Sequence, residues 1–415
     1  MKTALDLAKA AKEASVYLRT LSTAKKNAAL AAIAEELHRQ RRDLQQENEK
    51  DIAAAQKNDL SSAMIDRLTL SDKVIDSMIQ GLHEVIALPD PVGEIGDMTV
   101  RPNGLWVGKM RIPLGVVGFI YESRPNVTVD SAALCLKSGN AIILKGGKEA
   151  IFSNLALSKL MDTALQNVGI PTGAIGVAPT TDRQFTQDLI GLENWVDVVI
   201  PRGGEGLVRF VAENAKIPVL KHYEGICHAF IDASADLAMA TEIVFNSKVQ
   251  RPGTCNALET LLVHQDIAAQ FLPGMVRTLQ DAGVTLKGDS ATRKFFSNML
   301  EATDDDWKTE YLDLILSVKI VSNMEEAMRH IDQYGSNHTE IIVTNDYAHG
   351  RTFLSQVDAS LVMINASTRL NDGGELGLGA EIGISTSKLH AYGTMGLKEL
   401  TTTKFVAMGS GQLRE

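Results

Sequence analysis

The stretch GVVGFIYESRPNVTVDSAALCLKSGNAIILKGGKEA, residues 115–150, decides the fold. It opens with an apolar run, GVVGFIYE, passes through a helical pattern at residues 127–137 and returns to a second apolar run, AIILK. Two short apolar runs joined through a helix are typical of two parallel strands with a helical crossover. The stretch therefore predicts a β-α-β unit.

The same rhythm continues on both sides of this unit. A helix is predicted at 149–168, a strand at VDVVI and a helix at 205–214. After Gly225 the pattern starts again with CHAFID, a helix at 235–245, LETLLV, a helix at 267–282, and the strands VKIV, TEIIVT and SLVMI. Alternating strands and helices favour parallel sheets covered on both faces. We predict an α/β protein with two successive doubly wound domains, joined near residues 220–225.

The two ends of the chain differ from this pattern. Helices are predicted at 2–21, 24–44 and 71–87. Asn103-Gly104 stands between two alternating runs and predicts a hairpin at 97–113, which could pair with another subunit. The closing TTTKFVAM reads as one more strand.

Composition limits the classes of function. A net charge of -10 argues against a broad basic face for nucleic acid. No apolar run approaches the roughly 20 residues of a membrane span, and the N-terminal residues favour an amphipathic helix over a signal peptide. Three cysteines fit a reducing compartment, so a cytoplasmic location is expected. The nine histidines show no metal-ligand spacing, and no metal site is expected.

Cys255, in QRPGTCNALETLLV, is the candidate nucleophile. Pro252 and Gly253 break regular structure just before it, and a buried strand is predicted just after it. The cysteine is therefore expected in a loop anchored by the core, with Arg251 nearby to favour the thiolate. A buried small hydrophobe is the alternative, and it is the one preferred for Cys135 and Cys227.

Two turns after predicted strands are candidate anion sites. Lys145 and Lys148 flank Gly146-Gly147 in the first, and Gly203-Gly204 forms the second. Backbone amides and ammonium groups together suit phosphates. Neither turn matches the GxGxxG dinucleotide fingerprint.

Further polar candidates lie in two loops. Asn126 can donate an amide N–H to an oxygen, and Arg124 can meet a phosphate or carboxylate at the carboxyl end of a strand. Arg369 can bind a carboxylate bidentately from the Gly-rich stretch 365–386. Loop polarity alone, or a mobile surface loop, is the alternative for these residues.

These segments together resemble the γ-glutamyl phosphate reductases of the aldehyde dehydrogenase superfamily. IYESRPNVTVD, ILKGGKEA, IPRGG, RPGTCNALETLLV, TEYLDLILSVKIV, NASTR and LGAEIGIST are similar to that family's signatures, in its order and over nearly the whole chain. The resemblance implies N-terminal helices and an NADP-binding domain in residues 1–225, with 97–113 for oligomerisation. It implies a catalytic domain in 226–365, and a return segment with an oligomerisation strand in 366–415.

The resemblance also implies the chemistry. Cys255 would attack L-glutamyl 5-phosphate, and NADPH would reduce the resulting thioester to L-glutamate 5-semialdehyde, in the second step of proline biosynthesis from glutamate. Asn126 and the Cys255 backbone N–H would stabilise the oxyanion, and Glu310 would hold the nicotinamide ribose. Lys148 stands where a glutamate is common in the superfamily, which favours NADP. Arg124, Arg251 and Arg369 are the candidates for substrate binding.

Some features depart from the superfamily's patterns. Hydrolytic relatives carry a catalytic glutamate in an ELGGK-like motif, whereas this chain reads LKHYEGICH with Glu224 out of register. That difference favours reduction over a non-phosphorylating, hydrolytic aldehyde dehydrogenase, which is the alternative function. Tyr392 and Thr394 replace an expected Arg and Pro, and their role stays open. A homo-oligomer is expected, and a transient contact with glutamate 5-kinase is left open.

Overall fold

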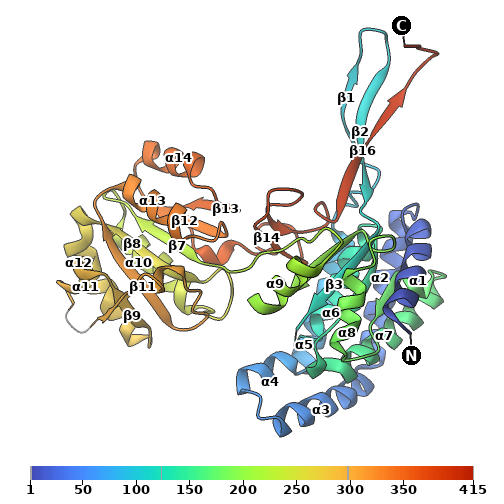
Figure 1. Ribbon diagram of the computed structural model, residues 1–415, viewed down its shortest axis with the longest axis horizontal. Helices are drawn as coiled ribbons and strands as arrows, with labels where there is room; N and C mark the ends of the chain where they lie inside the picture. Colours follow the sequence, from blue (N-terminus) through green and yellow to red (C-terminus); the bar gives the residue numbers. More distant parts are fainter. Residues whose placement is uncertain (1, 123, 297–298, 415) are drawn as a thin grey trace. The chain divides into compact units, whose positions relative to one another are not determined.

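The computed structural model describes residues 2–122, 124–296 and 299–414 (Figure 1). It divides into two compact units. Unit 1 comprises Met1–Lys221, Gly377–Ile384 and Met395–Glu415, and unit 2 comprises His222–Leu376 and Ser385–Thr394. Each unit holds its own parallel sheet, so the predicted α/β class is confirmed.

The sheet of unit 1 contains the predicted β-α-β unit. Strands β3 (Val116–Tyr121) and β4 (Ala141–Lys145) are parallel neighbours joined through α6 (Asn126–Lys137). The sheet is completed by β5 (Ile175–Val177) and β6 (Val198–Arg202), in the order β5-β4-β3-β6. Every residue of β3 and β4 is buried, as expected for a parallel sheet covered on both faces.

Helices surround this sheet. They are α1 (Ala4–Leu18), α2 (Thr23–Arg39), α3 (Arg41–Lys57), α4 (Ser62–Leu68), α5 (Asp72–Ala87), α7 (Ile151–Asn167), α8 (Arg183–Ile190) and α9 (Glu205–Asn214), with short 3₁₀ turns η1 (Lys148–Ala150) and η2 (Thr172–Ala174). The predicted helix at 24–44 is wrong in extent. The chain leaves helical geometry at Gln40, where φ is -97° and ψ is 17°, and a separate helix begins there.

A second, three-stranded sheet belongs to unit 1. The predicted hairpin is confirmed as β1 (Ile95–Val100) and β2 (Trp106–Pro113), and the predicted last strand is β16 (Thr401–Met408). β16 runs antiparallel along the whole of β2 (Figure 1). Two segments nearly 300 residues apart in the sequence therefore build one sheet.

Unit 2 is built on a seven-stranded parallel sheet. Its strands are β7 (Cys227–Ile231), β8 (Leu258–His264), β9 (Thr285–Gly288), β10 (Leu300–Glu301), β11 (Ile315–Val321), β12 (Thr339–Val343) and β13 (Leu361–Ile364), in the order β10-β9-β11-β8-β7-β12-β13. Its helices are α10 (Leu237–Val249), α11 (Gln265–Asp281), α12 (Ser290–Arg293), α13 (Met324–Tyr334) and α14 (Tyr347–Gln356), with η3 (Asp306–Lys308) and η4 (Thr368–Leu370). A two-stranded sheet, β14 (Gly383–Ser385) with β15 (Gly393–Met395), lies in the Gly-rich return region.

None of the helices in the described parts of the chain combines the length and the apolar character of a membrane span.

Candidate active site

Cys255 lies in a loop that enters the buried strand β8, as predicted. Cys255 is half-buried, whereas Cys135 on α6 and Cys227 on β7 are fully buried. Burial raises the pKa of the thiols of Cys135 and Cys227 well above the ordinary value. Cys255 is thus the cysteine whose placement suits a reacting nucleophile.

The Cys255 loop is held by hydrogen bonds within unit 2. Thr254 Oγ1 donates to the Arg251 carbonyl at 2.8 Å. Asn256 Nδ2 donates to the Asn371 carbonyl at 3.0 Å, and Arg369 donates to the Asn256 side chain. The residues on both sides of the cysteine are therefore fixed in position.

One of the two unexpected residues near the C-terminus, Thr394, is connected to these contacts, whereas Tyr392 bonds elsewhere in unit 2. Thr394 Oγ1 donates to Asn371 Oδ1 at 2.7 Å, so it supports the residue that holds Asn256. Tyr392 OH donates to Asp358 Oδ1 at 3.1 Å. Thr394 is thus connected through Asn371 to the Cys255 loop, a role that the sequence did not indicate.

Gly225 lies directly against the Cys255 loop. A Cβ atom at this position would collide with the backbone of Cys255, chiefly with its carbonyl oxygen. The Cys227 thiol donates to the same carbonyl oxygen at 3.2 Å. Close backbone approach is a common reason for glycine in a fixed site, and here it limits where the Cys255 backbone can lie.

Two histidines lie beside Cys255, and the sequence analysis missed them. His222 precedes β7, Cys255 precedes β8 and His338 precedes β12, and these three strands are neighbours in the parallel sheet. The amino ends of parallel neighbours meet at one edge. One imidazole nitrogen of each histidine and the sulfur of Cys255 lie within 4.8 Å of one another.

The arginines proposed for substrate binding divide between the units. Arg251 and Arg369 belong to unit 2, and Arg124 belongs to unit 1. Burial lowers the pKa of Arg369, with the charge of Arg251 adding to the effect, and the Arg369 charge also interacts with Cys255. The Arg369 guanidinium therefore lies near enough to interact with both Arg251 and Cys255. Glu310, in the connection from η3 to β11, is half-buried in the same unit.

Asn126 begins α6 in unit 1, directly after the loop that follows β3. Its Nδ2 donates to Asp130 Oδ2 at 3.2 Å. Desolvation raises the pKa of Asp130 to about 6, while the Asn126 hydrogen bond lowers it. The Asn126 side chain is thus oriented by a carboxyl group one turn along its own helix.

The two predicted anion sites both follow strands of unit 1. Lys145 ends β4 with its ammonium group donating to the Gly146 carbonyl at 3.1 Å, and burial lowers its pKa. Gly147 precedes η1, where Lys148 is exposed. A Cβ atom at Gly146 would collide with Asn154, so the turn requires glycine.

The second turn, at Gly203 and Gly204, precedes α9. Glu122 accepts a hydrogen bond from the Gly204 amide at 2.9 Å, and a Cβ atom at Gly203 would lie 2.6 Å from its carboxyl carbon. The carboxylate therefore takes up an amide that the sequence analysis assigned to a phosphate.

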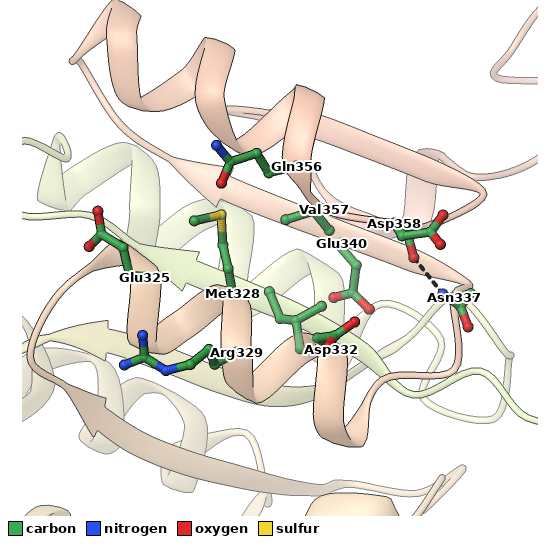
Figure 2. Close-up of a pocket in the computed structure, with 10 residues that line it drawn as sticks. Glu325, Met328, Arg329, Asp332, Asn337, Glu340, Gln356, Val357 and Asp358 are labelled. Atoms are coloured by element: carbon green, nitrogen blue, oxygen red, sulfur yellow. Dashed lines mark hydrogen bonds between the residues drawn. The ribbon is translucent and has the colours of Figure 1, made fainter.

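A separate cavity of about 420 Å³ lies in unit 2 between α13 and α14 (Figure 2). Figure 2 shows Glu340 and Asn337 on its wall, with Asn337 donating to the Asp358 carbonyl at 2.6 Å. None of the predicted site residues lines it. The chemistry suggested by the sequence is therefore not in this cavity.

Comparison with known proteins agrees with these features. The aldehyde dehydrogenase family model matches residues 2–294. The chain is 55% identical over 413 residues to a γ-glutamyl phosphate reductase of Desulfotalea psychrophila, covering 100% of this chain and 99% of the relative. A γ-glutamyl phosphate reductase of Meiothermus ruber is 57% identical and covers 98% of each chain. The chain belongs to the γ-glutamyl phosphate reductases of the aldehyde dehydrogenase family.

Solved structures support this family assignment. The crystal structure of γ-glutamyl phosphate reductase from Thermotoga maritima matches with a TM-score of 0.98 at 47% identity, covering 100% of both chains. An acetylating aldehyde dehydrogenase from Geobacillus thermoglucosidasius matches at 0.71 with 18% identity, over 99% of this chain and 97% of the other, which shows a shared fold. The predicted aldehyde-dehydrogenase-like architecture is confirmed.

Proposed function

We propose that this chain reduces L-glutamyl 5-phosphate to L-glutamate 5-semialdehyde and phosphate, with NADPH as the reductant and Cys255 as the nucleophile. The observation that carries the proposal is the half-buried Cys255 thiol on a fixed loop, in a chain that aligns end to end with γ-glutamyl phosphate reductases. The reaction would be the second step of proline biosynthesis from glutamate.

The first step is acyl transfer to sulfur. The Cys255 thiolate attacks the acyl carbon, the bond from that carbon to the phosphate oxygen breaks, and phosphate leaves with the electron pair. Arg369 contributes positive charge near the thiol and Arg251 contributes charge near Arg369, which suits an anionic substrate. We propose that Arg251, Arg369 and Arg124 bind the charged groups of the substrate.

The second step is reduction of the thioester. Bound NADPH supplies the hydride that the thioester carbon accepts. Asn126 Nδ2 and the Cys255 backbone N–H stabilise the oxyanion, where losing one donor costs about 2.7–4 kcal/mol. The oxygen's electron pair then expels the Cys255 thiolate and releases the aldehyde.

The residues assigned to NADPH fit a dinucleotide phosphate. Lys145, Gly146, Gly147 and Lys148 form a tight turn at the carboxyl end of β4, where ligands bind in such sheets. The exposed Lys148 ammonium suits a 2′-phosphate. We assign the turn of Gly203 and Gly204 to the same cofactor, which would have to displace the Glu122 carboxylate from the Gly204 amide. We assign Glu310 to the nicotinamide ribose.

The wider setting is part of the proposal. The free thiols of all three cysteines fit the reducing cytoplasm. We propose a homo-oligomer assembled through the sheet of β1, β2 and β16. A transient contact with glutamate 5-kinase would shield the labile acyl phosphate from water.

The test runs the reaction in reverse. Wild type should turn over the semialdehyde continuously with NADP⁺ only when phosphate or arsenate is present, and Cys255→Ser should lose at least about a thousandfold in kcat because a serine hydroxyl is the weaker nucleophile. Cys135→Ala is the matched control, since Cys135 is buried on α6, and it should keep its rate. Turnover without phosphate would instead indicate a hydrolytic aldehyde dehydrogenase.

A further inference from the structure

A cluster of nitrogen and sulfur ligands surrounds the proposed nucleophile. One imidazole nitrogen of His222, one of His338 and the Cys255 sulfur all lie within 4.8 Å of one another. His222 and Cys255 are half-buried and His338 is fully buried. The cluster thus has two members that solvent can reach and one fixed in the protein.

The ligand types select the class of ion. One thiolate and two imidazoles suit Zn²⁺ and other thiophilic divalent cations, with a fourth position left for water. Zn–N bonds of about 2.0–2.1 Å and Zn–S bonds of about 2.3 Å require ligand atoms about 3.3–3.6 Å apart in a tetrahedron. A closure of about 1 Å is needed, which the half-buried His222 can supply by rotating its side chain.

The surroundings of His338 resemble the support that metal ligands usually have. Its Nδ1 forms a hydrogen bond with the Thr339 hydroxyl at 2.7 Å, and Thr339 Oγ1 in turn accepts from Asn371 at 2.8 Å. A ligating histidine usually engages its other ring nitrogen in this way. Nε2 is then the donor to the ion. The buried Glu340 carboxyl also interacts electrostatically with His338.

We propose that His222, Cys255 and His338 form a binding site for a thiophilic divalent cation, with Zn²⁺ as the type case. On binding, the Cys255 thiol releases its proton to solvent and its sulfur bonds to the ion, while both imidazoles donate lone pairs. The binding itself is independent of the proposed function. An ion bonded to the Cys255 sulfur would reversibly inhibit the proposed reaction, and this consequence rests on the proposed role of Cys255.

The test measures binding before activity. Full-length chain without a histidine tag, stripped with chelator, is titrated with Co²⁺ and with Zn²⁺ against a chromophoric chelator. The expected result is one ion per chain, with thiolate-to-cobalt absorption that Cys255→Ser abolishes. His222→Gln and His338→Gln should each weaken Zn²⁺ binding by at least about 10–100-fold, since losing even an outer partner of a ligand has that effect.

His83→Gln is the matched control, because His83 is exposed on α5 in the other unit, and it should bind like wild type. Each variant's folding is checked by circular dichroism, and His222→Gln keeps the test valid if the buried His338 variant fails to fold. Equal Zn²⁺ affinity in wild type and His222→Gln, or no thiolate band with Co²⁺, would overturn the site. If Zn²⁺ binds as expected while Cys255→Ser remains active, the site stands and the proposed function fails.

Discussion

At the scale of single residues, the three cysteines differ in how deeply they are buried. Cys135 and Cys227 are enclosed by the core, where burial keeps them as protonated thiols, whereas Cys255 stands half-buried on a loop. The Cys227 thiol donates to the Cys255 carbonyl and so supports the backbone of the proposed nucleophile. A buried cysteine can thus serve the site without reacting.

Gly225→Ala tests the fit around the nucleophile. The added methyl group must displace the Cys255 backbone, and a misplacement of about 1 Å costs about a hundredfold in rate. We expect kcat to fall by about that factor. Gly274→Ala is the control, because nothing lies within 4 Å of a Cβ atom there. Steady-state kinetics showing equal kcat for both variants would contradict this reasoning.

Asp130→Asn tests the carboxyl group beside Asn126. The folded pKa of Asp130, about 6, lies above its ordinary 3.8. The folded state therefore binds more protons than the unfolded state between these values, and stability falls as pH rises through them. Asp130→Asn removes this loss of stability. The free energy of unfolding of the variant minus that of wild type should therefore increase by about 1–2 kcal/mol as the pH is raised from about 4.5 to about 8. Urea unfolding that gives a pH-independent difference would be the contrary result.

At the scale of elements, turns and loops at strand ends carry the candidate chemistry. The turn after β4 presents Lys148, and the loops before β7, β8 and β12 present His222, Cys255 and His338. The strands fix the spacing of these residues, while the loops leave Lys148 exposed and His222 and Cys255 half-buried.

Lys148→Glu tests the cofactor preference. A carboxylate in place of the ammonium group repels a 2′-phosphate and can accept hydrogen bonds from a free ribose. The ratio of kcat/KM for NADPH to that for NADH should fall by at least about tenfold. Lys148→Gln, which only removes the charge, should give an intermediate ratio. An unchanged ratio in both variants would argue against contact between Lys148 and the 2′-phosphate.

Elements with a strong apolar period were predictable, and others were not. The strands β3 and β4 were evident because they are continuous buried runs. Helix α3 was missed beyond residue 44, because the buried positions of this charged helix include Asn48 and Asp51 as well as Leu44 and Ala55. Asp51 accepts from the amides of Phe152 and Ser153 at the start of α7. A polar contact of this kind leaves no hydrophobic period in the sequence.

The candidate site was predictable only where a local motif marked it. Cys255 had Pro252 and Gly253 before it and an apolar strand after it. His222 and His338 had no such mark, since their proximity to Cys255 depends on β7, β8 and β12 being neighbours. Strand order is a long-range property that spacing along the chain does not reveal.

At the scale of the whole molecule, one sheet of unit 1 exposes large apolar side chains. They are Ile95, Val100, Trp106, Phe405 and Met408 on β1, β2 and β16. Exposed apolar groups clustered on one element mark interaction surfaces. β16 also has a free edge within the described sheet, because β2 is its one neighbour there.

Phe405→Glu tests this surface. Phe405 is 76% exposed, so a charge there should leave the subunit folded while weakening association. Sedimentation velocity should show wild type as an oligomer and the variant shifted toward the 44.9 kDa monomer. Lys404→Glu, at the neighbouring exposed position, controls for added negative charge. A monomeric wild type, or a variant with unchanged mass, would refute the assignment.

The most direct test of the central claim is a rapid-mixing measurement with semialdehyde and NADP⁺ in the absence of phosphate. If the acyl group is carried on Cys255 and leaves to phosphate, wild type should form a burst of one NADPH per active subunit and then stop until phosphate is added. Cys255→Ser should show no burst. Continued turnover without phosphate, or a burst in the serine variant, would contradict the account.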